Sequence, residues 1–273
     1  MRLQYLLIAL FIALSLSLSF GTSISILAPY PMTISDYEEY NLGTIGPGQT
    51  ISLSVEPKTT TGGIYGNGGR WDMLNITRPP LDWTTEPSKN MGDPLEVRLT
   101  APKDAAPGDY TALVTITDEN NAEHLGEMTF RAKVTVDPDV IDMDVTPTYT
   151  NIGANQPARF LITITNKGAA SDVFEVSSAG IRDWDFKKTI YVGSKQTKQL
   201  SYEVAGAEEQ TLHAQIKARS LSSDLIQKNQ NVTIKVETDL ISDYKASTRG
   251  LLVFPIIEQP VYSLMGLLSN LFG

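Results

Sequence analysis

The sequence predicts an all-β protein made of two β-sandwiches in tandem. Between Thr22 and Asp239, short runs such as TISLSVEP and LEVRLTAP alternate apolar and polar residues. Alternation with period two indicates strands with one buried face, and turn residues about every 8 to 12 positions are typical of sandwiches. The pattern also occurs twice, because GPGQTISLSVEP in the first half matches GANQPARFLITITNKG in the second.

These patterns divide the chain into four parts. We expect a signal peptide over residues 1–21, a first sandwich over 22–138, a second over 139–239, and an apolar attachment segment over 240–273. A chain of 273 residues has room for two domains of ordinary size.

The N-terminal part, MRLQYLLIALFIALSLSLSFG, predicts a signal peptide helix. Arg2 precedes an apolar run from Tyr5 to Phe20, and the small residues Ser19 and Gly21 stand two apart. The alternative is an uncleaved anchor helix, for which the run is short of the roughly 20 residues of a span. Either interpretation places the body of the chain outside the cell.

Composition excludes several classes of function. The net charge of -9 argues against nucleic acid as a partner, since phosphate binding requires a basic face. The absence of cysteine removes disulfides and thiolate metal sites. The two histidines, His124 and His213, fall in a predicted turn and on a predicted solvent face, and no hydrolase or nucleotide-binding motif is present. We therefore expect no enzyme activity, no catalytic residues and no cofactor, although 31 acidic residues leave a carboxylate-pair hydrolase open as a third hypothesis.

A glycine-rich stretch, TTTGGIYGNGGRWD, follows the first strands and holds Tyr65 and Trp71. One interpretation is a binding loop whose aromatic rings stack on sugars, since functional loops are common on rigid sandwiches. The other is a long loop between strands. The stretch lacks the Lys-Ser/Thr that closes a phosphate-binding loop.

Further along, YTALVTITDENNAEHLGEMTFRAKVTV predicts a hairpin that turns between Asp118 and Glu123. Just before it, the proline turn from Pro102 to Ala106 leads into Pro107-Gly108-Asp109-Tyr110. Pro107 and Gly108 suit a corner, and Tyr110 can bury its ring while its hydroxyl binds backbone.

The stretch PLDWTTEP…LEVRLTAPKDAAPGDYTALVTIT resembles the alpha-galactosidase-associated (NPCBM-associated) immunoglobulin-like domain of archaeal and bacterial secreted and surface proteins. The resemblance implies that both sandwiches are immunoglobulin-like. The second half keeps FLITITNKGAASDVFEV but has AGAEEQTLHAQ where the Gly-Asp-Tyr corner would stand. In both halves an Asp-Trp pair, Asp82-Trp83 and Asp183-Trp184, precedes a strand.

Four acidic residues, Asp137, Asp139, Asp142 and Asp144, surround the Pro-containing junction VDPDVIDMDVTP. Clustered carboxylates can bind calcium, but the spacing is loose and we expect solvated acids and no metal. Asn75 (NIT) and Asn231 (NVT) are glycosylation sequons, which we expect on the surface.

The last 23 residues, LLVFPIIEQPVYSLMGLLSNLFG, carry one charge, Glu258. From Pro260 onward, apolar residues at helical spacing predict a short amphipathic helix with one apolar face: Val261, Leu264, Met265, Leu268, Leu271 and Phe272.

Three placements of this tail compete. It docks on a membrane surface or a membrane-protein partner, it packs on the second sandwich, or it spans the bilayer. Pro255, Glu258 and the lack of a basic residue beyond the tail argue against a span. We favour docking, because the segment follows a complete sandwich, and the lack of basic residues on its polar face favours a protein partner.

The sequence therefore indicates an extracellular, membrane-associated protein of the cell surface or envelope. Its expected work is structural or adhesive, as a tandem scaffold attached through its C-terminal segment. The alternative is a carbohydrate-binding accessory module with an extracellular glycan as its ligand.

Overall fold

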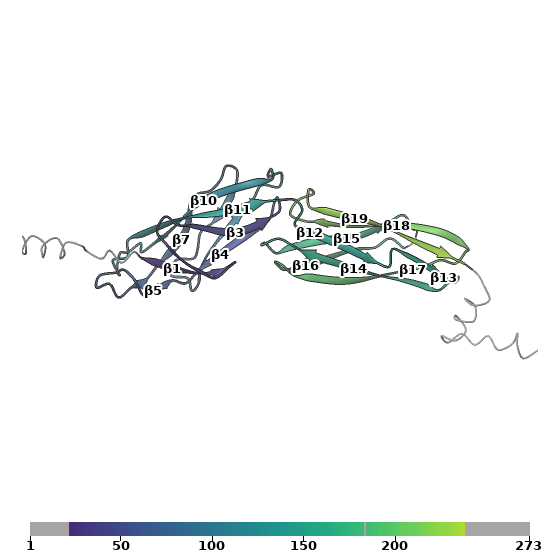
Figure 1. Ribbon diagram of the computed structural model, residues 1–273, viewed down its shortest axis with the longest axis horizontal. Coiled ribbons are helices and arrows are strands. Elements are labelled where there is room, and N and C mark those ends of the chain that lie inside the picture. Colours follow the sequence, from purple (N-terminus) through teal and green to yellow (C-terminus); the bar gives the residue numbers. More distant parts are fainter. Residues whose placement is uncertain (1–21, 183, 238–273) are drawn as a thin grey trace, which may run out of the picture.

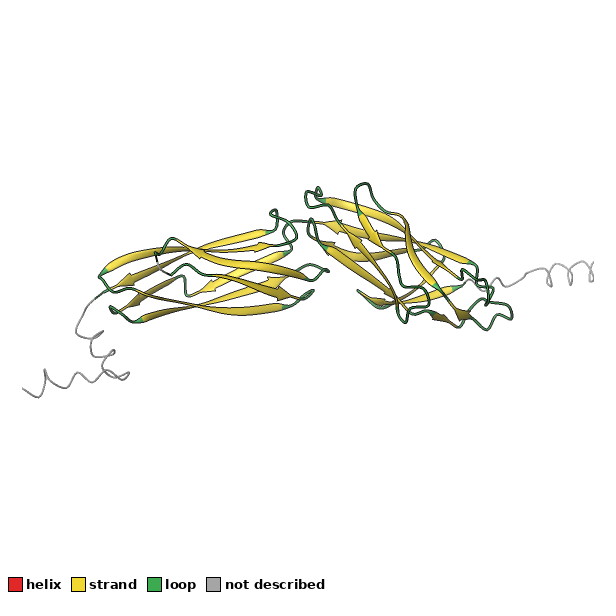
Figure 2. Cartoon of the chain, turned by 180° about the vertical axis from the view of Figure 1, so that it is seen from behind, coloured by secondary structure: helices red, strands yellow, loops and turns green. Residues whose placement is uncertain are grey.

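The computed structural model describes residues 22–182 and 184–237, and these form two β-sandwiches joined end to end (Figure 1). The predicted signal peptide helix, the C-terminal helix and all six predicted docking residues lie outside the described residues. The chain is strand and loop throughout the described part, as Figure 2 shows from behind. No helix there is long and apolar enough to cross a membrane.

The first sandwich, module 1, contains eleven strands. In chain order they are β1 (Ser23–Ala28), β2 (Met32–Ser35), β3 (Glu39–Ile45), β4 (Thr50–Val55), β5 (Lys58–Thr59), β6 (Gly69–Arg70), β7 (Met73–Arg78), β8 (Thr84–Glu86), β9 (Leu95–Thr100), β10 (Gly108–Thr117) and β11 (Glu127–Val136). One sheet has the order β2-β1-β4-β9-β8, the other β3-β11-β10-β7, and β5 pairs only with β6.

The second sandwich, module 2, contains eight strands. They are β12 (Ile141–Thr146), β13 (Tyr149–Ile152), β14 (Pro157–Asn166), β15 (Asp172–Ala179), β16 (Lys187–Val192), β17 (Thr197–Ala205), β18 (Gln210–Ser220) and β19 (Gln227–Val236). Its sheets have the orders β12-β14-β17 and β13-β19-β18-β15-β16. The boundary that we placed between residues 138 and 139 falls in the connection from β11 to β12.

Both modules have immunoglobulin-like strand order. In each, the first strand pairs antiparallel within its own sheet, β1 with β4 and β12 with β14. A strand that lies between these two in sequence joins the other sheet and runs parallel to the last strand of the module. These parallel pairs are β3 with β11 and β13 with β19. The sequence repeat therefore corresponds to a repeat of topology, with strands from both ends of each module in one sheet.

The alternation seen in the sequence decides which side chains are buried. Along β11, for example, Met128, Phe130, Ala132, Val134 and Val136 are buried, and the residues between them face outward. Strands of this kind bury a row of side chains between two sheets about 10 Å apart. Each module has its own apolar core of this construction.

The predicted corner at Tyr110 is present. The Tyr110 hydroxyl donates a hydrogen bond of 2.9 Å to the Ala106 carbonyl. Its ring lies 5.2 Å, centroid to centroid, from the ring of Trp83, which is only 6% exposed. The matching Trp184 of module 2 is 39% exposed instead, so the repeated Asp-Trp motif does not give the same packing in both halves.

The two ends of the described chain lie at opposite ends of the molecule (Figure 1). β1 begins at the pole of module 1 farthest from module 2, and β19 ends at the pole of module 2 farthest from module 1. We call these the free pole of module 1 and the exit pole of module 2.

Candidate functional site: the joint between the modules

Polar and apolar contacts connect the two modules at a joint, where their ends meet. Module 1 contributes the turn between β3 and β4 and the backbone of Lys103. Module 2 contributes the loop between β14 and β15 and the loop between β18 and β19. The connection from Asp137 to Val140 passes beside them. Because these loops are short, the ends of the two sandwiches are in direct contact.

Apolar packing crosses the joint. Ala169 and Ala170, from the β14–β15 loop of module 2, are buried as part of the core of module 1. Val140 and Ile226, which belong to the core of module 2, lie against Gly46 of module 1. Each module therefore completes the apolar interior of the other, and separating them would expose buried surface at about 25 cal/mol per Å².

Among the described residues, three hydrogen bonds join one module to the other. The Ala169 backbone N–H donates to the Thr44 carbonyl at 2.7 Å. The Ser223 hydroxyl donates to the Lys103 carbonyl at 2.6 Å. The Gln49 side-chain Nε2 donates to Oδ2 of Asp172 at 2.7 Å.

Asp172 is the centre of this network and is only 5% exposed. Its Oδ2 accepts from Gln49 and, at 2.6 Å, from the Ser220 hydroxyl. Its Oδ1 accepts from the Ser222 hydroxyl at 2.8 Å and from the Val173 N–H at 2.7 Å. A carboxylate that is buried this deeply needs several hydrogen-bond donors in place of water, and Asp172 has four. Three of the four donors come from module 2. Replacing Gln49 would therefore remove the one hydrogen bond that links this carboxylate to module 1.

Two glycines let the module surfaces approach each other. A Cβ on Gly48, whose φ is +70°, would lie 2.2 Å from the Ser222 carbonyl oxygen of module 2. A Cβ on Gly46 would lie 2.4 Å from Cδ1 of Ile226. The Gly46 N–H also donates to Oε1 of Gln49 at 2.7 Å, which orients the Gln49 amide toward Asp172.

Beside the joint, the acids that could have formed a calcium site have protein partners. The Lys228 and Lys167 ammonium groups lie 2.7 and 2.9 Å from the Asp139 carboxylate. Their hydrogen bonds, that of Lys228 being the stronger, lower the pKa of Asp139 from 3.8 to about 2. In residues 22–182 and 184–237, no three His, Cys, Asp or Glu side chains are grouped so that they could hold a metal ion. These two ion pairs fix the connection to module 2.

The glycine-rich loop places its two aromatic residues differently. Tyr65 is 85% exposed, whereas Trp71 is 0% exposed and forms part of the core of module 1. Trp71 is therefore a core residue and cannot stack on a sugar. This corrects the prediction that Trp71, together with Tyr65, binds a glycan. Its backbone N–H donates to the Pro57 carbonyl at 2.7 Å, so the β5–β6 hairpin turns the chain back into the sandwich.

The two sequons lie on outward-facing positions of strands. Asn231, on β19, is exposed, and Asn75, on β7, is half-buried beside β10. Both histidines are exposed. Nδ1 of His213 lies 3.2 Å from the Thr233 hydroxyl, within hydrogen-bond distance.

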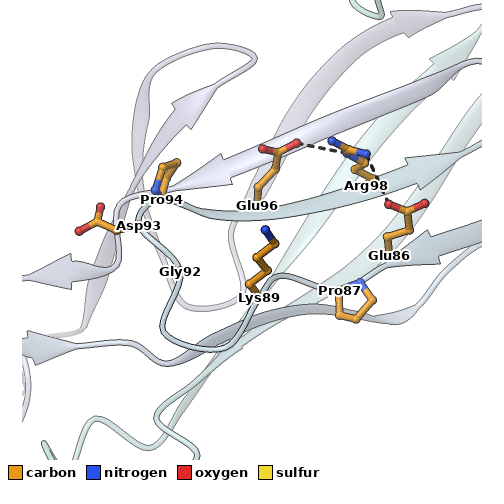
Figure 3. Close-up of a pocket in the computed structure, with 8 residues that line it drawn as sticks. All are labelled: Glu86, Pro87, Lys89, Gly92, Asp93, Pro94, Glu96 and Arg98. Carbon is orange, nitrogen blue, oxygen red and sulfur yellow. Dashed lines mark hydrogen bonds and ion pairs between the residues drawn. The ribbon is translucent and has the colours of Figure 1, made fainter.

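A cavity of about 430 Å³ opens beside β8 and β9 in module 1 (Figure 3). Its lining is charged, with Arg98 bridging the carboxylates of Glu86 and Glu96 at 3.6 and 3.3 Å. The residues that line it include no aromatic ring, so it does not replace Trp71 as a platform for sugars.

The sequence contained one indirect signal for the joint. The matched motifs GPGQT and GANQP place a glutamine three residues after a glycine in each module. In both, the glycine N–H donates to the glutamine Oε1, at 2.7 Å for Gly46 and Gln49 and 3.4 Å for Gly153 and Gln156. Only Gln49 faces another module, and nothing local in the sequence pairs it with Asp172, 123 residues away.

No protein-family model matches the sequence, and no curated protein matches it. Several solved structures resemble the chain at low TM-scores. The CARDB domain of a Pyrococcus furiosus protein, solved in complex with di-metal ions, is 15% identical over 36% of this chain and 90% of that chain, with a TM-score of 0.29. A chimeric titin Z1Z2 that carries a peptide from decorin is 10% identical over 80% of this chain and 99% of that chain, with a TM-score of 0.37.

Fibronectin(III)-like modules of Clostridium thermocellum are 15% identical over 78% of this chain and 94% of theirs, with a TM-score of 0.25. At these identities and TM-scores the likeness supports no conclusion about this chain. The strand order of the two modules identifies the chain as a tandem of immunoglobulin-like β-sandwiches.

Proposed function

We propose that this protein is an exported, non-catalytic scaffold of the cell surface or envelope. Its two immunoglobulin-like modules act as one rigid spacer, attached through the segment that follows Glu237. The observation that carries the proposal is the joint: a spacer keeps its length only if its modules cannot bend against each other. Gln49, Ala169 and Ser223 connect the modules at three separate points.

The direction of the chain supports the same function. The described chain ends at the exit pole of module 2, and the apolar tail LLVFPIIEQPVYSLMGLLSNLFG follows in the sequence. Attachment there would hold the free pole of module 1, with its exposed Tyr65, at a fixed distance from the point of attachment. The apolar segment from Tyr5 to Phe20 supports export.

We further propose kinship with the alpha-galactosidase-associated immunoglobulin-like modules of archaeal and bacterial surface proteins. The motif Pro107-Gly108-Asp109-Tyr110 supports this kinship, since Tyr110 forms the corner that the resemblance implies. Such modules serve as spacers, adhesive units and accessory domains, so the kinship concerns architecture.

The test is membrane fractionation of the full chain in its host beside a chain without residues 251–273. We expect the full chain in the membrane or envelope fraction and the shortened chain in the soluble exported fraction. As a control, Leu161→Ser removes an exposed apolar side chain from module 2 and leaves the distribution unchanged. Equal distribution of the full and shortened chains would contradict attachment.

A further inference from the structure

The outer edge of β17 in module 2 differs from every other sheet edge of the described chain. β17 is nine residues long and pairs with β14 over its whole length, from Thr197 to Ala205. It is the last strand of its sheet. Among the described residues, no strand other than β14 bonds to its backbone. Half of its N–H and C=O groups therefore face outward, in a row that can accept another strand.

The other edges of the four large sheets are short or blocked. β2, β8 and β13 have only four, three and four residues. On β7, Ser88 already bonds to both the N–H and the C=O of Leu74. β16 has six residues and begins with two adjacent lysines, Lys187 and Lys188. On β3, the Thr44 carbonyl already bonds to module 2. On β12, the Gln230 side chain bonds to both the N–H and the C=O of Val145, at 3.1 Å each.

The segment beside β17 leaves its backbone edge open. Phe186 stacks on the Tyr202 ring with centroids 4.8 Å apart, and the Tyr202 hydroxyl donates to the Trp184 carbonyl at 2.8 Å. These contacts involve the buried side chain of Tyr202, which points into the core. The exposed side chains of the strand are polar, at Thr197, Lys198, Gln199, Ser201 and Glu203.

We propose that β17 is a dimerisation edge, where two copies of this chain pair antiparallel about a two-fold axis. Ser201 is the middle residue of the strand. Placing Ser201 opposite Ser201 of the second copy aligns all nine residues and keeps both apolar faces on the same side of the sheet. The result is a continuous six-stranded sheet, and an isologous contact of this kind closes at two copies.

The polar side chains of the edge complement each other in this pairing. In the centred register Gln199 lies opposite Glu203 of the second copy, twice by symmetry, so each amide can donate to the second oxygen of a carboxylate whose first oxygen already pairs with Arg159 at 2.8 Å. Lys198 lies opposite Val204, and no two like charges oppose each other. A parallel pair would instead place Lys198 beside Lys198. The chain's own tail is a poorer occupant, because Pro255 interrupts LLVFPII and has no N–H to donate.

This inference goes beyond the proposed function and does not depend on attachment. The two-fold axis runs the copies antiparallel, so their free poles point in opposite directions. Such a pair would lie along a surface. The length of residues 238–250 allows at most ~45 Å between each exit pole and that surface.

Cysteine cross-linking of the full chain tests the proposal directly, because the native sequence has no cysteine. In Ser201→Cys the two thiols oppose each other across the axis, and we expect a disulfide dimer under mild oxidation. Leu161→Cys is the matched control: it is exposed and lies beside Ser201 on β14, one strand farther from the axis. We expect the Ser201→Cys chain to cross-link at least roughly tenfold faster.

A second variant tests the interface without cross-linking. Ser201→Lys places two positive charges opposite each other, so sedimentation should show a monomer where the native chain is a dimer. Thr189→Lys, on the exposed edge strand β16 of the other sheet, should remain a dimer. Both should keep the native far-ultraviolet circular dichroism spectrum, since both positions are exposed in the single chain.

Three results would overturn the proposal: a native chain that stays monomeric at every concentration, equal cross-linking of the two cysteine variants, or cross-linking of Ser201→Cys that appears only after residues 251–273 are removed. The last result would assign the edge to the tail. It remains distinguishable from failure of the proposed function, which membrane fractionation measures.

Discussion

The Gln49 side-chain amide donates a 2.7 Å hydrogen bond to the Asp172 carboxylate, across 123 residues of sequence and from one module to the other. Gln49 is 1% exposed, so the bond is closed to water. A buried polar group that loses its partner is destabilising by more than the bond itself contributes. This pair therefore favours one arrangement of the modules over all others.

Gln49→Ala should destabilise the protein by about 1–3 kcal/mol, because it leaves the Asp172 carboxylate and the Gly46 N–H each one partner short. Chemical denaturation measures the change in the free energy of unfolding. Gln210→Ala, at an exposed position at the start of β18, should change it by no more than about 0.5 kcal/mol. Equal effects of the two substitutions would show that the joint contributes no stability.

The repeated Asp-Trp motif gives a second prediction. Trp83→Ala should cost about 3–5 kcal/mol, since it empties the core beside Tyr110. Trp184→Ala should cost much less, because that ring is already partly in water. Thermal unfolding compares the two variants, and a larger loss for Trp184 would contradict the packing described for the two modules.

The Tyr110 hydroxyl gives a third. Tyr110→Phe keeps the ring on Trp83 but removes the hydrogen bond to the Ala106 carbonyl, at a cost of about 0.5–1.5 kcal/mol. The same measurement applies. No change in stability would show that the corner depends on Pro107 and Gly108 alone.

The connection between the modules should respond to acid. Hydrogen bonds from Lys228 and Lys167 lower the pKa of Asp139 to about 2, below its ordinary 3.8. The stabilisation from these pairs is therefore fully present above pH 3.8 and is lost as the pH falls toward 2. Asp139→Asn should be less stable than the native chain at pH 6, and the difference should disappear near pH 2. A difference that stays constant between these pH values would remove Asp139 from this role.

The class of fold could be predicted from the sequence because strand alternation is a local signal. The hairpin around Asp118 and the corner at Tyr110 are local too, and the structure confirms both. The prediction that Trp71 contacts a ligand was wrong because it also rested on a local signal. A glycine-rich run usually indicates an exposed loop, but here two residues on each side pair as β5 and β6 and direct Trp71 into the core.

The joint could not be predicted, because its chemistry is assembled from distant residues. In the sequence Gly48 is an ordinary turn glycine, and only the structure shows that Ser222 of the other module lies against it. Asp172 looks like an ordinary polar residue at the start of a strand until Gln49, Ser220 and Ser222 surround its carboxylate. Pairings of this kind depend on how two folded modules meet, which no short stretch of sequence encodes.

Gly48→Ala separates joint packing from backbone strain. Gly48 and Gly66 have nearly the same φ, +70° and +69°, so alanine at either site carries a similar strain of about 1–2 kcal/mol. Only at Gly48 does the added methyl group meet the other module, 2.2 Å from the Ser222 carbonyl oxygen, while Gly66 has nothing within 4 Å. Gly48→Ala should therefore loosen the joint, and Gly66→Ala should leave it intact.

The distance between spin labels at the two ends of the molecule tests the rigid spacer most directly. Glu119→Cys, near the free pole of module 1, and Glu208→Cys, near the exit pole of module 2, are both exposed sites in a chain without native cysteine. Double electron–electron resonance on the labelled chain, diluted into an excess of unlabelled chain so that each dimer holds one labelled copy, should give one narrow distance distribution for the otherwise native protein and for Gly66→Ala, and a broad one for Gly48→Ala. A broad distribution in the native chain would contradict a rigid joint and, with it, the scaffold.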